Sequence, residues 1–589
     1  MCGIIGFKGT GLVTAELVEG LQRMEYRGYD SWGVAVMTKK GIFVEKKVGA
    51  IGDGKLEQPP VDALLGIAHT RWATHGGVTK TNAHPHLSKD KRFAVAQNGI
   101  VENYLELKSS LQKQGYQFKT STDTEVIVHL IDAKLKQVKI FAEAVRLAFL
   151  ELIGRNTIIT LDQQTEQIVA IRNGSPLVIG HLPDGGVLLA SDTLPLAGKA
   201  RTVTYLDDQQ LVVINDKVSV FAVKTGKPLK LHQQKFDFIE QKIDKAGFDH
   251  FMLKEIVEQQ YTIKEAVSYS DQELLPLIKA LKKARTIYTV GAGTAAFAAG
   301  QIARVLRVVA KLPVQELKAY EIDSYLPLMS AKDLLLAVSQ SGETADTLDA
   351  VGKAQKRGVT IASIVNMIGS TLSRGSQYAY LSRSGPEICV ASTKAYTAQL
   401  AWGYLLAMTI IGKHKQAQAE IGKVAKKLKG YFTDQTFRQL QKLAIDLAKH
   451  EHFFVIGKAQ HFYTALEGAL KIKEITYKHF EGFSAGELKH GVIALIDQGT
   501  PVFGIVGNDQ YQADVLSALA EVRARGARTF GITARPNEFF DVHIPAIDGG
   551  NLDSITKIIP FQLLSYFLGI QQKNNPDKPR NLAKSVTVK

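Results

Sequence analysis

Short apolar runs, separated by polar turns, dominate roughly the first 220 residues of the chain. Such runs are typical of β-strands, and four of them occupy residues 33–37, 93–96, 156–160 and 210–214. Helical spacing intervenes in four other segments, at residues 11–26, 101–115, 123–136 and 140–152. The pattern predicts an α+β domain over residues 2–222.

A polar, weakly periodic stretch follows at residues 223–250, where we expect a linker. Apolar periodicity resumes at Phe251, where a helix should begin. From about residue 284 onward, predicted strands and helices alternate along the chain, and this alternation is typical of parallel sheets.

An internal repeat divides this second half. Val290-Gly291 returns as Ile456-Gly457, and Arg357-Gly358 returns as Arg525-Gly526 at almost the same offset. A nearly constant offset indicates two copies of one three-layer α/β domain, which we place at residues 251–425 and 426–573. The first copy carries a polar loop, residues 339–344, that the second has lost.

Composition is ordinary for a globular protein, with 45% apolar and 22% charged residues among 589. No apolar run approaches the roughly 20 residues that span a bilayer, and the N-terminal segment lacks the features of a signal peptide. The net charge of +15 is dispersed over predicted helices, which argues against a nucleic-acid partner. The two cysteines, Cys2 and Cys389, suit a reducing compartment. We therefore expect a cytoplasmic protein with no nucleic-acid or membrane partner, and no cysteine cluster or histidine-rich tract suggests a metal.

The cysteine at position 2 has a specific chemical consequence. Removal of Met1 would leave Cys2 with a free α-amine, which titrates near ~8, close to the thiol. One residue would then supply both a nucleophile and its base.

Four further segments accompany Cys2, at residues 25–31, 69–75, 98–99 and 122–125. Together they resemble the class II glutamine amidotransferases, which are N-terminal-nucleophile hydrolases that release ammonia from glutamine. The resemblance implies an αββα sandwich with Cys2 as nucleophile. It also implies an oxyanion hole at Asn98 and Gly99, and a glutamine pocket lined by Arg71, Thr74, His75 and Asp123. Taken singly, Arg71 and Asp123 would be a solvated ion pair, and Asn98-Gly99 would be a hairpin turn.

Two loops of the second half suggest phosphate binding. Residues 291–296 follow a predicted strand and fit the G-x-G-x-x-A pattern of dinucleotide sites, with an acidic residue, Glu316, after a later strand. An NAD-dependent oxidoreductase is therefore one alternative. The next loop, residues 339–344, places hydroxyls and backbone N–H groups before a helix, which suits a compact phosphate dianion. A serine-rich helix cap would explain that loop without a ligand.

Three more segments favour a sugar phosphate, at residues 390–394, 465–476 and 486–491. With the tail, they resemble the isomerising glutamine–fructose-6-phosphate aminotransferase family over essentially the whole chain. The resemblance implies that L-glutamine and D-fructose 6-phosphate give L-glutamate and D-glucosamine 6-phosphate, the first step of UDP-GlcNAc synthesis. It also implies two sugar-isomerase domains, no cofactor, a homodimer, and an ammonia channel gated at Trp72, which would otherwise be a core aromatic.

The residues that this family uses for catalysis and phosphate binding can be matched individually to positions in the second half of the chain. His490 would open the sugar ring, and Lys584 would capture the ketone as a Schiff base. Glu474, with Lys471 on the same helix face, would move a proton between C1 and C2. The phosphate would be held by Ser339, Gln340, Ser341 and Thr344, with Thr294 and Ser392 nearby. Without the resemblance, Lys471 and Glu474 would be an exposed ion pair and His490 a buried, satisfied imidazole.

The tail, residues 574–589, is irregular and Pro-rich, so its composition predicts a frayed end. The alternation of Val586 and Val588 favours docking instead, which a catalytic Lys584 requires.

Three positions depart from the family pattern. Ala295 replaces a usual serine beside the phosphate, Gln97 replaces a histidine before Asn98, and Val492 replaces a proline. The long inserts of eukaryotic relatives are absent, which indicates a bacterial-type enzyme without nucleotide-sugar feedback. Two other functions stay open: a different class II amidotransferase, such as one making phosphoribosylamine, and a non-catalytic sugar-phosphate sensor. The first does not explain the repeat, and the second leaves Cys2, Asn98 and Lys584 unexplained.

Overall fold

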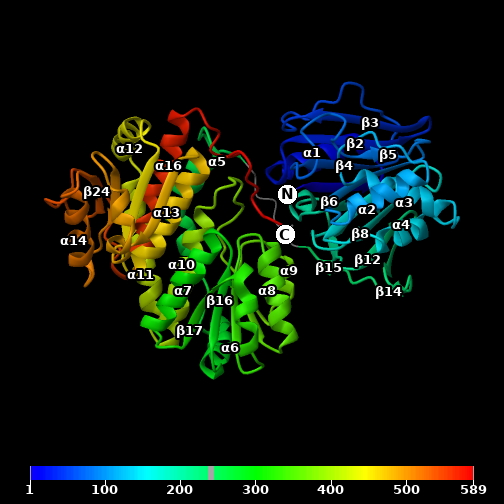
Figure 1. Ribbon diagram of the computed structural model, residues 1–589. Helices are drawn as coiled ribbons and strands as arrows, with labels where there is room; N and C mark the ends of the chain where they lie inside the picture. Colours follow the sequence, from blue (N-terminus) through cyan, green and yellow to red (C-terminus); the bar gives the residue numbers. More distant parts are fainter. Residues whose placement is uncertain (1, 237–243, 588–589) are drawn as a thin grey trace. The chain divides into compact units, whose positions relative to one another are not determined.

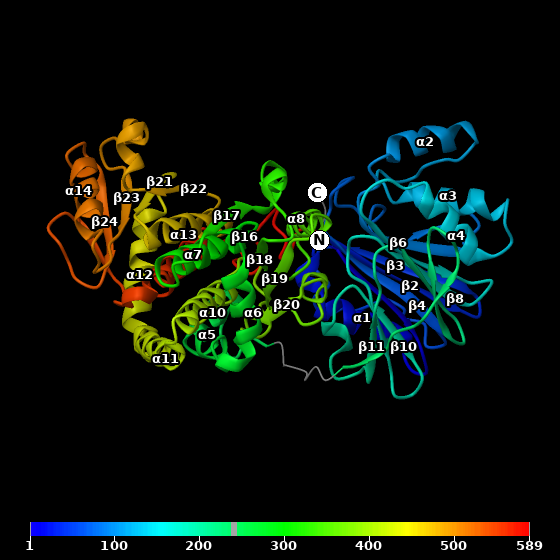
Figure 2. The same cartoon turned by 90° about the horizontal axis from the view of Figure 1, so that it is seen from below.

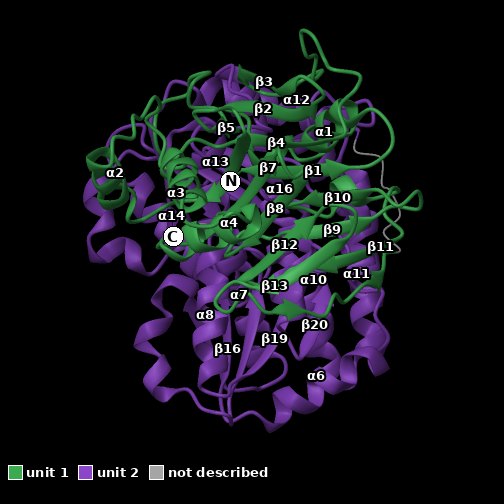
Figure 3. Cartoon of the chain, turned by 90° about the vertical axis from the view of Figure 1, so that its right-hand side faces the viewer, with its two compact units in different colours: residues 1–242, 585–589 green, residues 243–584 purple. Residues whose placement is uncertain are grey.

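A computed structural model describes residues 2–236 and 244–587, and the chain divides into two compact units. Unit 1 comprises Met1–Lys242 with Ser585–Lys589, and unit 2 comprises Ile243–Lys584 (Figure 3). No helix in the described ranges is long and apolar enough to cross a membrane.

Unit 1 contains two antiparallel sheets. The first has the order β15-β11-β9-β10-β1-β4-β2-β3, and its strands are β1 (Gly3–Lys8), β2 (Ser31–Thr38), β3 (Gly41–Val48), β4 (Leu65–Arg71), β9 (Val178–His181), β10 (Val187–Ala190), β11 (Thr202–Tyr205) and β15 (Gln234–Lys235). The second has the order β14-β13-β12-β8-β7-β6-β5, and its strands are β5 (His86–Leu87), β6 (Phe93–Gly99), β7 (Asn156–Asp162), β8 (Gln167–Arg172), β12 (Gln210–Ile214), β13 (Val218–Ala222) and β14 (Pro228–Leu229). The four strands predicted from apolar runs lie in β2, β6, β7 and β12.

Four layers build unit 1, because each sheet is apolar on both faces. Side chains such as Ile4 and Ile67 of the first sheet meet Ala96 and Ile159 of the second in a core between the sheets. The outer face of the first sheet packs on α1 (Val13–Arg23). The outer face of the second packs on the helices α2 (Tyr104–Lys113), α3 (Glu125–Leu135) and α4 (Phe141–Leu150) (Figure 1). All four helices predicted in this half are thereby confirmed.

The expected linker begins inside this unit. Residues 228–229 form β14, which pairs with β13, and residues 234–235 form β15, which pairs with β11. Residues 237–243 of the expected linker lie outside the described part of the chain. The helix expected at Phe251 is confirmed as α5 (Phe251–Glu265).

Unit 2 contains two parallel five-stranded sheets with the same strand order, which confirms the repeat. Copy one has the order β17-β16-β18-β19-β20, formed by β16 (Ile287–Gly291), β17 (Val314–Lys318), β18 (Leu334–Val338), β19 (Thr360–Val365) and β20 (Tyr378–Leu381). Copy two has the order β22-β21-β23-β24-β25, formed by β21 (His452–Gly457), β22 (His479–Ser484), β23 (Pro501–Ile505), β24 (Arg528–Thr533) and β25 (Val542–Pro545).

Helices cover both faces of each sheet. The outer faces pack on α8 (Ala345–Lys356) in copy one and α14 (Gln512–Arg523) in copy two. The inner faces share one core with the remaining long helices, which are α5, α6 (Asp271–Lys283), α7 (Thr294–Val308), α10 (Lys394–Ile410), α11 (His414–Tyr431), α12 (Asp434–Leu447), α13 (Gln460–Thr476) and α16 (Ile558–Gln571). Two further helices are short, α9 (Thr371–Arg374) and α15 (Asp553–Thr556). Within that core α7 of copy one packs directly against α13 of copy two (Figure 2).

Candidate functional site

The N-terminal thiol lies where β1 begins beside β4. Gly3 pairs with Thr70, and the Gly3 N–H donates to the Thr70 Oγ1 at 3.1 Å. This pairing holds the half-buried Cys2 so that its Sγ accepts the Trp72 N–H at 3.3 Å. Burial raises the pKa of the Cys2 thiol, while the Trp72 N–H and Arg71 oppose the rise.

Asn98 and Gly99 end β6 beside Cys2. The Asn98 Nδ2 donates to the Cys2 carbonyl at 3.0 Å, and the Asn98 Oδ1 is buried without a hydrogen-bond partner. Gly99 has φ +140°, and a Cβ there would lie 2.0 Å from the Arg155 carbonyl oxygen, so only glycine fits. The hairpin-turn alternative is wrong, because both residues pair with β7 as the last residues of a strand.

Arg71 is the last residue of β4, and its side chain stabilises the loop that follows instead of forming an exposed ion pair. Its buried guanidinium donates to the carbonyls of His75 at 2.5 Å, Gly76 at 3.0 Å and Gly77 at 3.2 Å. Burial lowers the pKa of Arg71, and the charge of Asp123 acts against that shift.

Asp123, just before α3, accepts the Val101 N–H at 2.8 Å, and burial raises its pKa. Trp72 and His75 are half-buried and Thr74 is exposed. The structure therefore brings Arg71 and Asp123 into one partly buried region, together with the loop that follows β4.

Asp30 is a residue of this region that the sequence did not single out. Its Oδ2 accepts the Ala73 N–H at 2.7 Å, and its own N–H donates to the Arg71 carbonyl at 3.0 Å, so it fixes the loop after β4. Gly28 allows the close approach, because a Cβ there would lie 2.8 Å from the Arg71 carbonyl carbon. The signal was present, since both residues belong to the segment 25–31.

Gln97, one of the departures from the family pattern, lies against buried histidines. The rings of His69 and His84 are 4.4 Å apart, those of His84 and His86 are 4.8 Å apart, and the His69 Nε2 lies 3.0 Å from the Gln97 carbonyl oxygen. Burial lowers the pKa of all three histidines, to about 3 for His69. The Gln97 side chain donates to Asn156 at 2.6 Å and accepts from Thr124 at 2.5 Å, so glutamine is well bonded here.

The polar loop of copy one, residues 339–344, joins β18 to α8. The Ser339 Oγ accepts the Gly342 N–H at 2.9 Å, and the Ser341 Oγ accepts the Glu343 N–H at 3.1 Å. Thr344 is the residue before α8, and its side chain makes no capping bond. Gln340 and Thr344 are half-buried, whereas Ser339 and Ser341 are buried. The serines thus stabilise a turn within the loop and do not cap α8, and the loop presents several hydroxyls at one helix start.

Helix α13 of copy two brings Lys471 and Glu474 to the start of α7 of copy one. The Lys471 Nζ donates to the Glu474 Oε2 at 2.5 Å and to the Thr294 Oγ1 at 3.0 Å. The Lys471 side chain is fully buried, so the exposed-ion-pair alternative is wrong.

Glu467 is a third member of this cluster, and the sequence did not single it out although it lies in the segment 465–476. Its Oε1 lies 3.5 Å from the Lys471 Nζ and accepts the Thr294 hydroxyl at 3.2 Å, while its Oε2 is buried without a partner. Burial raises the pKa of Glu467 to about 8. Burial alone would lower the pKa of Lys471, but Glu467 and Glu474 raise it. The available signal was the i, i+4 spacing of Glu467 and Lys471.

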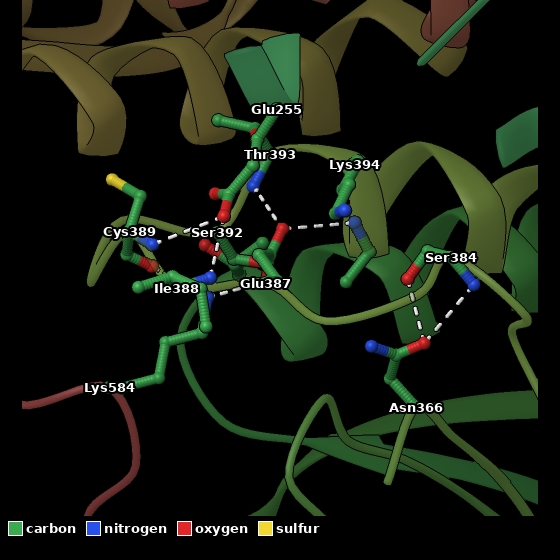
Figure 4. A network of polar contacts seen from close by, with 12 residues as sticks. Glu255, Asn366, Ser384, Glu387, Ile388, Cys389, Ser392, Thr393, Lys394 and Lys584 are labelled. Carbon is green, nitrogen blue, oxygen red and sulfur yellow. Dashed lines mark hydrogen bonds and ion pairs between the residues drawn. The ribbon is translucent and has the colours of Figure 1, made fainter. Parts of the chain in front are cut away.

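Lys584 is held in a buried network (Figure 4). Its Nζ donates to the Glu387 Oε2 at 2.5 Å and to the Cys389 carbonyl at 2.8 Å. Ser392 donates to the same Glu387 oxygen at 2.9 Å, and the Thr393 N–H donates to the other at 2.8 Å. Burial acts to raise the pKa of Glu387, but Lys584 lowers it overall.

A second carboxyl lies beside this network. The Glu255 Oε1 accepts the Ile388 N–H at 2.5 Å, and its Oε2 is buried without a partner. Burial and the nearby Glu387 raise the pKa of Glu255 to about 8. Neither Glu255 nor Glu387 was predicted, although Glu387 stands shortly before Ser392 in the chain.

The tail before Lys584 is docked on unit 2, so the prediction of a frayed end is wrong. The Asp577 carboxylate accepts the Phe251 and Met252 N–H groups at 3.0 and 2.8 Å, which caps the start of α5. The Arg580 guanidinium lies 4.1 Å from the centre of the Tyr477 ring. Further on, Val586 is 44% exposed whereas Thr587 is 1% exposed, so an alternation of buried valines does not explain docking. Val588 lies outside the described residues.

Within one chain, the structure does not bring His490 to the Lys471–Glu474 cluster or to the Lys584–Glu387 network. It ends the short 3₁₀ helix Glu487–His490 and is exposed, so the alternative of a buried imidazole is wrong. In the described ranges, no group of three or more His, Cys, Asp or Glu side chains is placed to hold a metal ion. Glu316, the acidic residue of the dinucleotide alternative, is bound by Tyr463 and Arg307.

Known proteins share this combination of parts. The sequence matches the SIS domain family at residues 280–409 and 446–565, and the glutamine amidotransferase domain family at residues 69–197. It is 39% identical over 612 residues to a protein of Pyrococcus horikoshii named "Glutamine--fructose-6-phosphate aminotransferase [isomerizing]". It is 38% identical over 624 residues to a protein of the same name from Chlorobaculum tepidum, and both alignments cover 100% of each chain.

Solved structures resemble the second half of the chain. The C-terminal domain of glucosamine-fructose-6-phosphate aminotransferase from Francisella tularensis matches with a TM-score of 0.52 and 32% identity. That alignment covers 57% of this chain and 100% of the other.

Proposed function

The chain belongs to the isomerising glutamine–fructose-6-phosphate aminotransferase family, and we propose how its residues divide that reaction. The overall conversion is glutamine-dependent: fructose 6-phosphate and glutamine give glucosamine 6-phosphate and glutamate. Unit 1 releases ammonia, and unit 2 aminates and isomerises the sugar phosphate. An NAD-dependent reaction, a phosphoribosylamine synthase and a sugar-phosphate sensor do not fit this membership.

We assign unit 1 to the N-terminal-nucleophile hydrolase fold, because its two antiparallel sheets lie between helical layers and Cys2 immediately precedes β1. The thiol attacks the side-chain amide carbon of glutamine, the amine leaves as ammonia, and water then cleaves the thioester to glutamate. Burial raises the pKa of Cys2, so the attack needs a base, and the α-amine freed by Met1 removal is adjacent. Asn98 and Gly99 stabilise the oxyanion, since the Asn98 amide keeps a second N–H beside the one that binds Cys2.

The glutamine ends are held by groups of opposite charge. Arg71 suits the α-carboxylate and Asp123 the α-ammonium, because both are largely buried and a substrate charge would compensate each of them. Thr74 and His75 line the pocket. Trp72, whose backbone contacts the Cys2 sulfur, is the proposed gate for ammonia.

Substitution of the two cysteines tests this half. Cys2→Ala should abolish glutamine hydrolysis, and so should a variant that keeps Met1. Cys389→Ser is the matched control, because Cys389 lies in unit 2, and it should retain glutaminase activity. Mass spectrometry that finds Met1 intact on fully active protein would contradict the amine's role.

In unit 2 the sugar phosphate lies at the edge of copy one. The hydroxyls of Ser339, Ser341 and Thr344 and the Gln340 amide hold the phosphate, with Thr294 and Ser392 nearby. His490 opens the ring. The Lys584 amine adds to the C2 carbonyl, water leaves, and ammonia then replaces the lysine at C2.

Isomerisation follows amination in this scheme. Glu474 removes a proton from C1 and returns it to C2, so that C1 becomes the aldehyde carbon and C2 carries the amine. Lys471 holds Glu474 in place and balances its charge. The observation that best supports this scheme is the position of Lys584, whose Nζ is held in a buried network 2.5 Å from the Glu387 Oε2 and 2.8 Å from the Cys389 carbonyl oxygen although the residue belongs to the tail.

We further propose that the protein acts as a homodimer in the cytoplasm. His490 is exposed, and Leu495 on the following 3₁₀ helix is 61% exposed, so a second copy could cover this face and bring His490 to a sugar site. Mixing two inactive variants tests this: His490→Ala and Lys584→Ala should restore part of the activity when they exchange subunits. A protein that runs as a monomer at full activity would contradict it. The two free cysteines suit a reducing compartment.

A further inference from the structure

A second cavity lies at the carboxyl edge of copy two. Its volume is about 390 Å³, within the usual range of small-molecule sites. It is lined by the loop after β23, the start of α13, the turn before α15 and one face of α7. Open parallel sheets bind ligands beyond the carboxyl ends of their strands, which is where copy one carries its phosphate loop.

The cavity is the counterpart of the sugar site by internal repeat. Helix α7 begins at Thr294 and α13 begins at Gln460, so these two residues correspond. Counted from the two helix starts, Val305 corresponds to Lys471, and Val308 corresponds to Glu474. Both valines line the cavity, so it has the position of the sugar site without its acid–base pair.

An arginine in the cavity lacks a partner. The half-buried Arg304 guanidinium forms no hydrogen bond or ion pair with the described residues, and burial lowers its pKa. An unpaired guanidinium suits a phosphate. Two carboxylates, Asp509 and Asp553, also line the cavity, and the charge of Asp509 acts against the lowering of the Arg304 pKa without forming an ion pair with it.

A buried histidine sits behind those carboxylates. His461 is 1% exposed, and neither of its ring nitrogens has a hydrogen-bond partner. Its Nε2 lies 3.7 Å from the Asp509 Oδ2 and 3.8 Å from the Asp553 Oδ2. Burial lowers the pKa of His461 to about 4, so the neutral ring does not balance the carboxylates. Asp553 is offset in part by the charge of Lys557 and by hydrogen bonds from the Gly549 N–H and the Thr556 hydroxyl, and burial still raises its pKa. Such an arrangement suits a cation from outside.

We propose that this cavity is a second binding site, for a phosphorylated amino sugar. The phosphate would face Arg304, and the ammonium would face Asp509 and Asp553. Gln460, Asn508 and Asn551 offer amides to sugar hydroxyls, and Val305 and Val308 offer an apolar face. A phosphorylated sugar without an amine fits less well, because the carboxylates would then repel it. The choice of ligand rests on the proposed function, whose product has this chemistry.

Equilibrium dialysis of the full chain with labelled glucosamine 6-phosphate tests the proposal. Wild type should bind two molecules per chain. The substitution R304Q should weaken one of the two sites at least tenfold, and V308W should fill the cavity and remove the same site. A paired variant, S341A with T344A, should weaken the other site. R307Q is the matched control, because Arg307 is on the same helix but pairs with Glu316 outside the cavity, and it should keep both sites.

One bound molecule per wild-type chain, or two unchanged sites in both R304Q and V308W, would overturn the proposal. Fructose 6-phosphate that binds the R304Q-sensitive site as tightly as glucosamine 6-phosphate would overturn the role of the carboxylates. Product formation from glutamine and fructose 6-phosphate is measured separately, so failure of the proposed function is distinguishable from failure of this second site.

Discussion

Copy one and copy two of unit 2 have the same strand order but differ at their carboxyl edges. In copy one that edge holds a serine-rich loop, Thr294 and the buried Glu387–Lys584 pair. In copy two the loop is replaced by residues 506–511, and α7 presents Val305 and Val308 where α13 presents Lys471 and Glu474 to copy one. The sheet therefore fixes where a ligand can bind, while a few side chains fix whether chemistry follows.

The backbone entering the first helix of each copy is preserved even where the sequence is not. Gly293 precedes α7 with φ 58° and ψ −133°, and Ala459 precedes α13 with φ 54° and ψ −114°. Alanine is strained in this region, so copy two keeps a turn suited to ligand binding at some cost. That retention agrees with a binding role for copy two.

The largest difference between the copies should come from the Lys471–Glu474 pair on α13. Glu474→Gln should slow glucosamine 6-phosphate formation by about 10²–10⁴-fold, because general acid–base catalysis contributes that much. Its counterpart at the cavity of copy two is Val308, at the end of α7, and Val308→Ala should change the rate little. Both variants should hydrolyse glutamine normally, which serves as the folding control. A near-normal synthase rate in Glu474→Gln would show that copy one's chemistry lies elsewhere.

The phosphate loop should show the next largest contrast. Thr344→Ala should raise the KM for fructose 6-phosphate about ten- to a hundredfold, since a hydrogen bond to a charged group contributes roughly 1.5–3 kcal/mol. Asn508→Ala, in the corresponding loop of copy two, should leave that KM unchanged. Steady-state kinetics with saturating glutamine measure both. Equal effects in the two loops would remove the functional distinction between the copies.

The two edges should also respond to pH with opposite signs. Glu255 keeps its proton in the folded protein up to about pH 8, whereas the unfolded carboxyl loses it near ~4.5, so wild-type stability falls as pH rises through this window. Glu255→Gln should remove that loss and gain stability over wild type by up to about 1.4 kcal/mol per pH unit. Denaturant unfolding at several pH values measures the difference in unfolding free energy between Glu255→Gln and wild type. Glu265→Gln, at an exposed position on the same helix, is the control.

For copy two the sign is reversed. His461 stays neutral in the fold down to about pH 4, whereas the unfolded ring is protonated below ~6.5. The free energy of unfolding of His461→Gln should therefore rise relative to that of wild type as the pH falls from 6.5 toward 4. The assigned pKa shifts would be contradicted if the difference in unfolding free energy between variant and wild type did not change with pH for either variant. These shifts arise chiefly from burial. At His461 they act beside the charges of Arg304, Asp509, Asp553 and Lys557.

The smallest effects should come from Gly293 and Ala459, the residues that precede α7 and α13. Gly293→Ala should lose about 1–3 kcal/mol of stability through backbone strain, since nothing lies within 4 Å of the added Cβ. Ala459→Gly should change stability in the opposite direction and by less, because glycine costs more entropy on folding. Thermal unfolding of both variants checks the pair. A loss of stability in Ala459→Gly would mean that the turn in copy two is not strained.

Local patterns in the sequence predicted much of this fold. The four helices of unit 1 and the start of α5 followed from apolar spacing, because each element buries one face in a local core, and the repeat followed from matching segments at a nearly constant offset. Docking of the tail was expected from a catalytic Lys584, but the contacts that hold it were not, since Asp577 is held by the start of α5, which is remote from it in the sequence.

The candidate site divides in the same way. Cys2, Asn98 and Lys584 stand in segments with a family pattern, so the sequence could single them out as candidates, and their roles stay predictions. Glu255, Glu387 and Glu467 were missed, because an isolated glutamate is typical of a solvated helix face and only the folded chain shows that these three are buried together with lysines. His490 was singled out as a candidate, but no local pattern predicted that it would be exposed within one chain.

Trapping of the sugar on the enzyme shows where the chemistry takes place. Borohydride added with fructose 6-phosphate reduces an imine, and peptide mapping then identifies the modified lysine. We predict a single sugar adduct at Lys584, lost in Lys584→Ala, while glutamine hydrolysis in unit 1 continues. An adduct at Lys471, Lys489 or Lys557, or synthase activity in a chain that ends before residue 580, would contradict the assignment of the reaction to the edge of copy one.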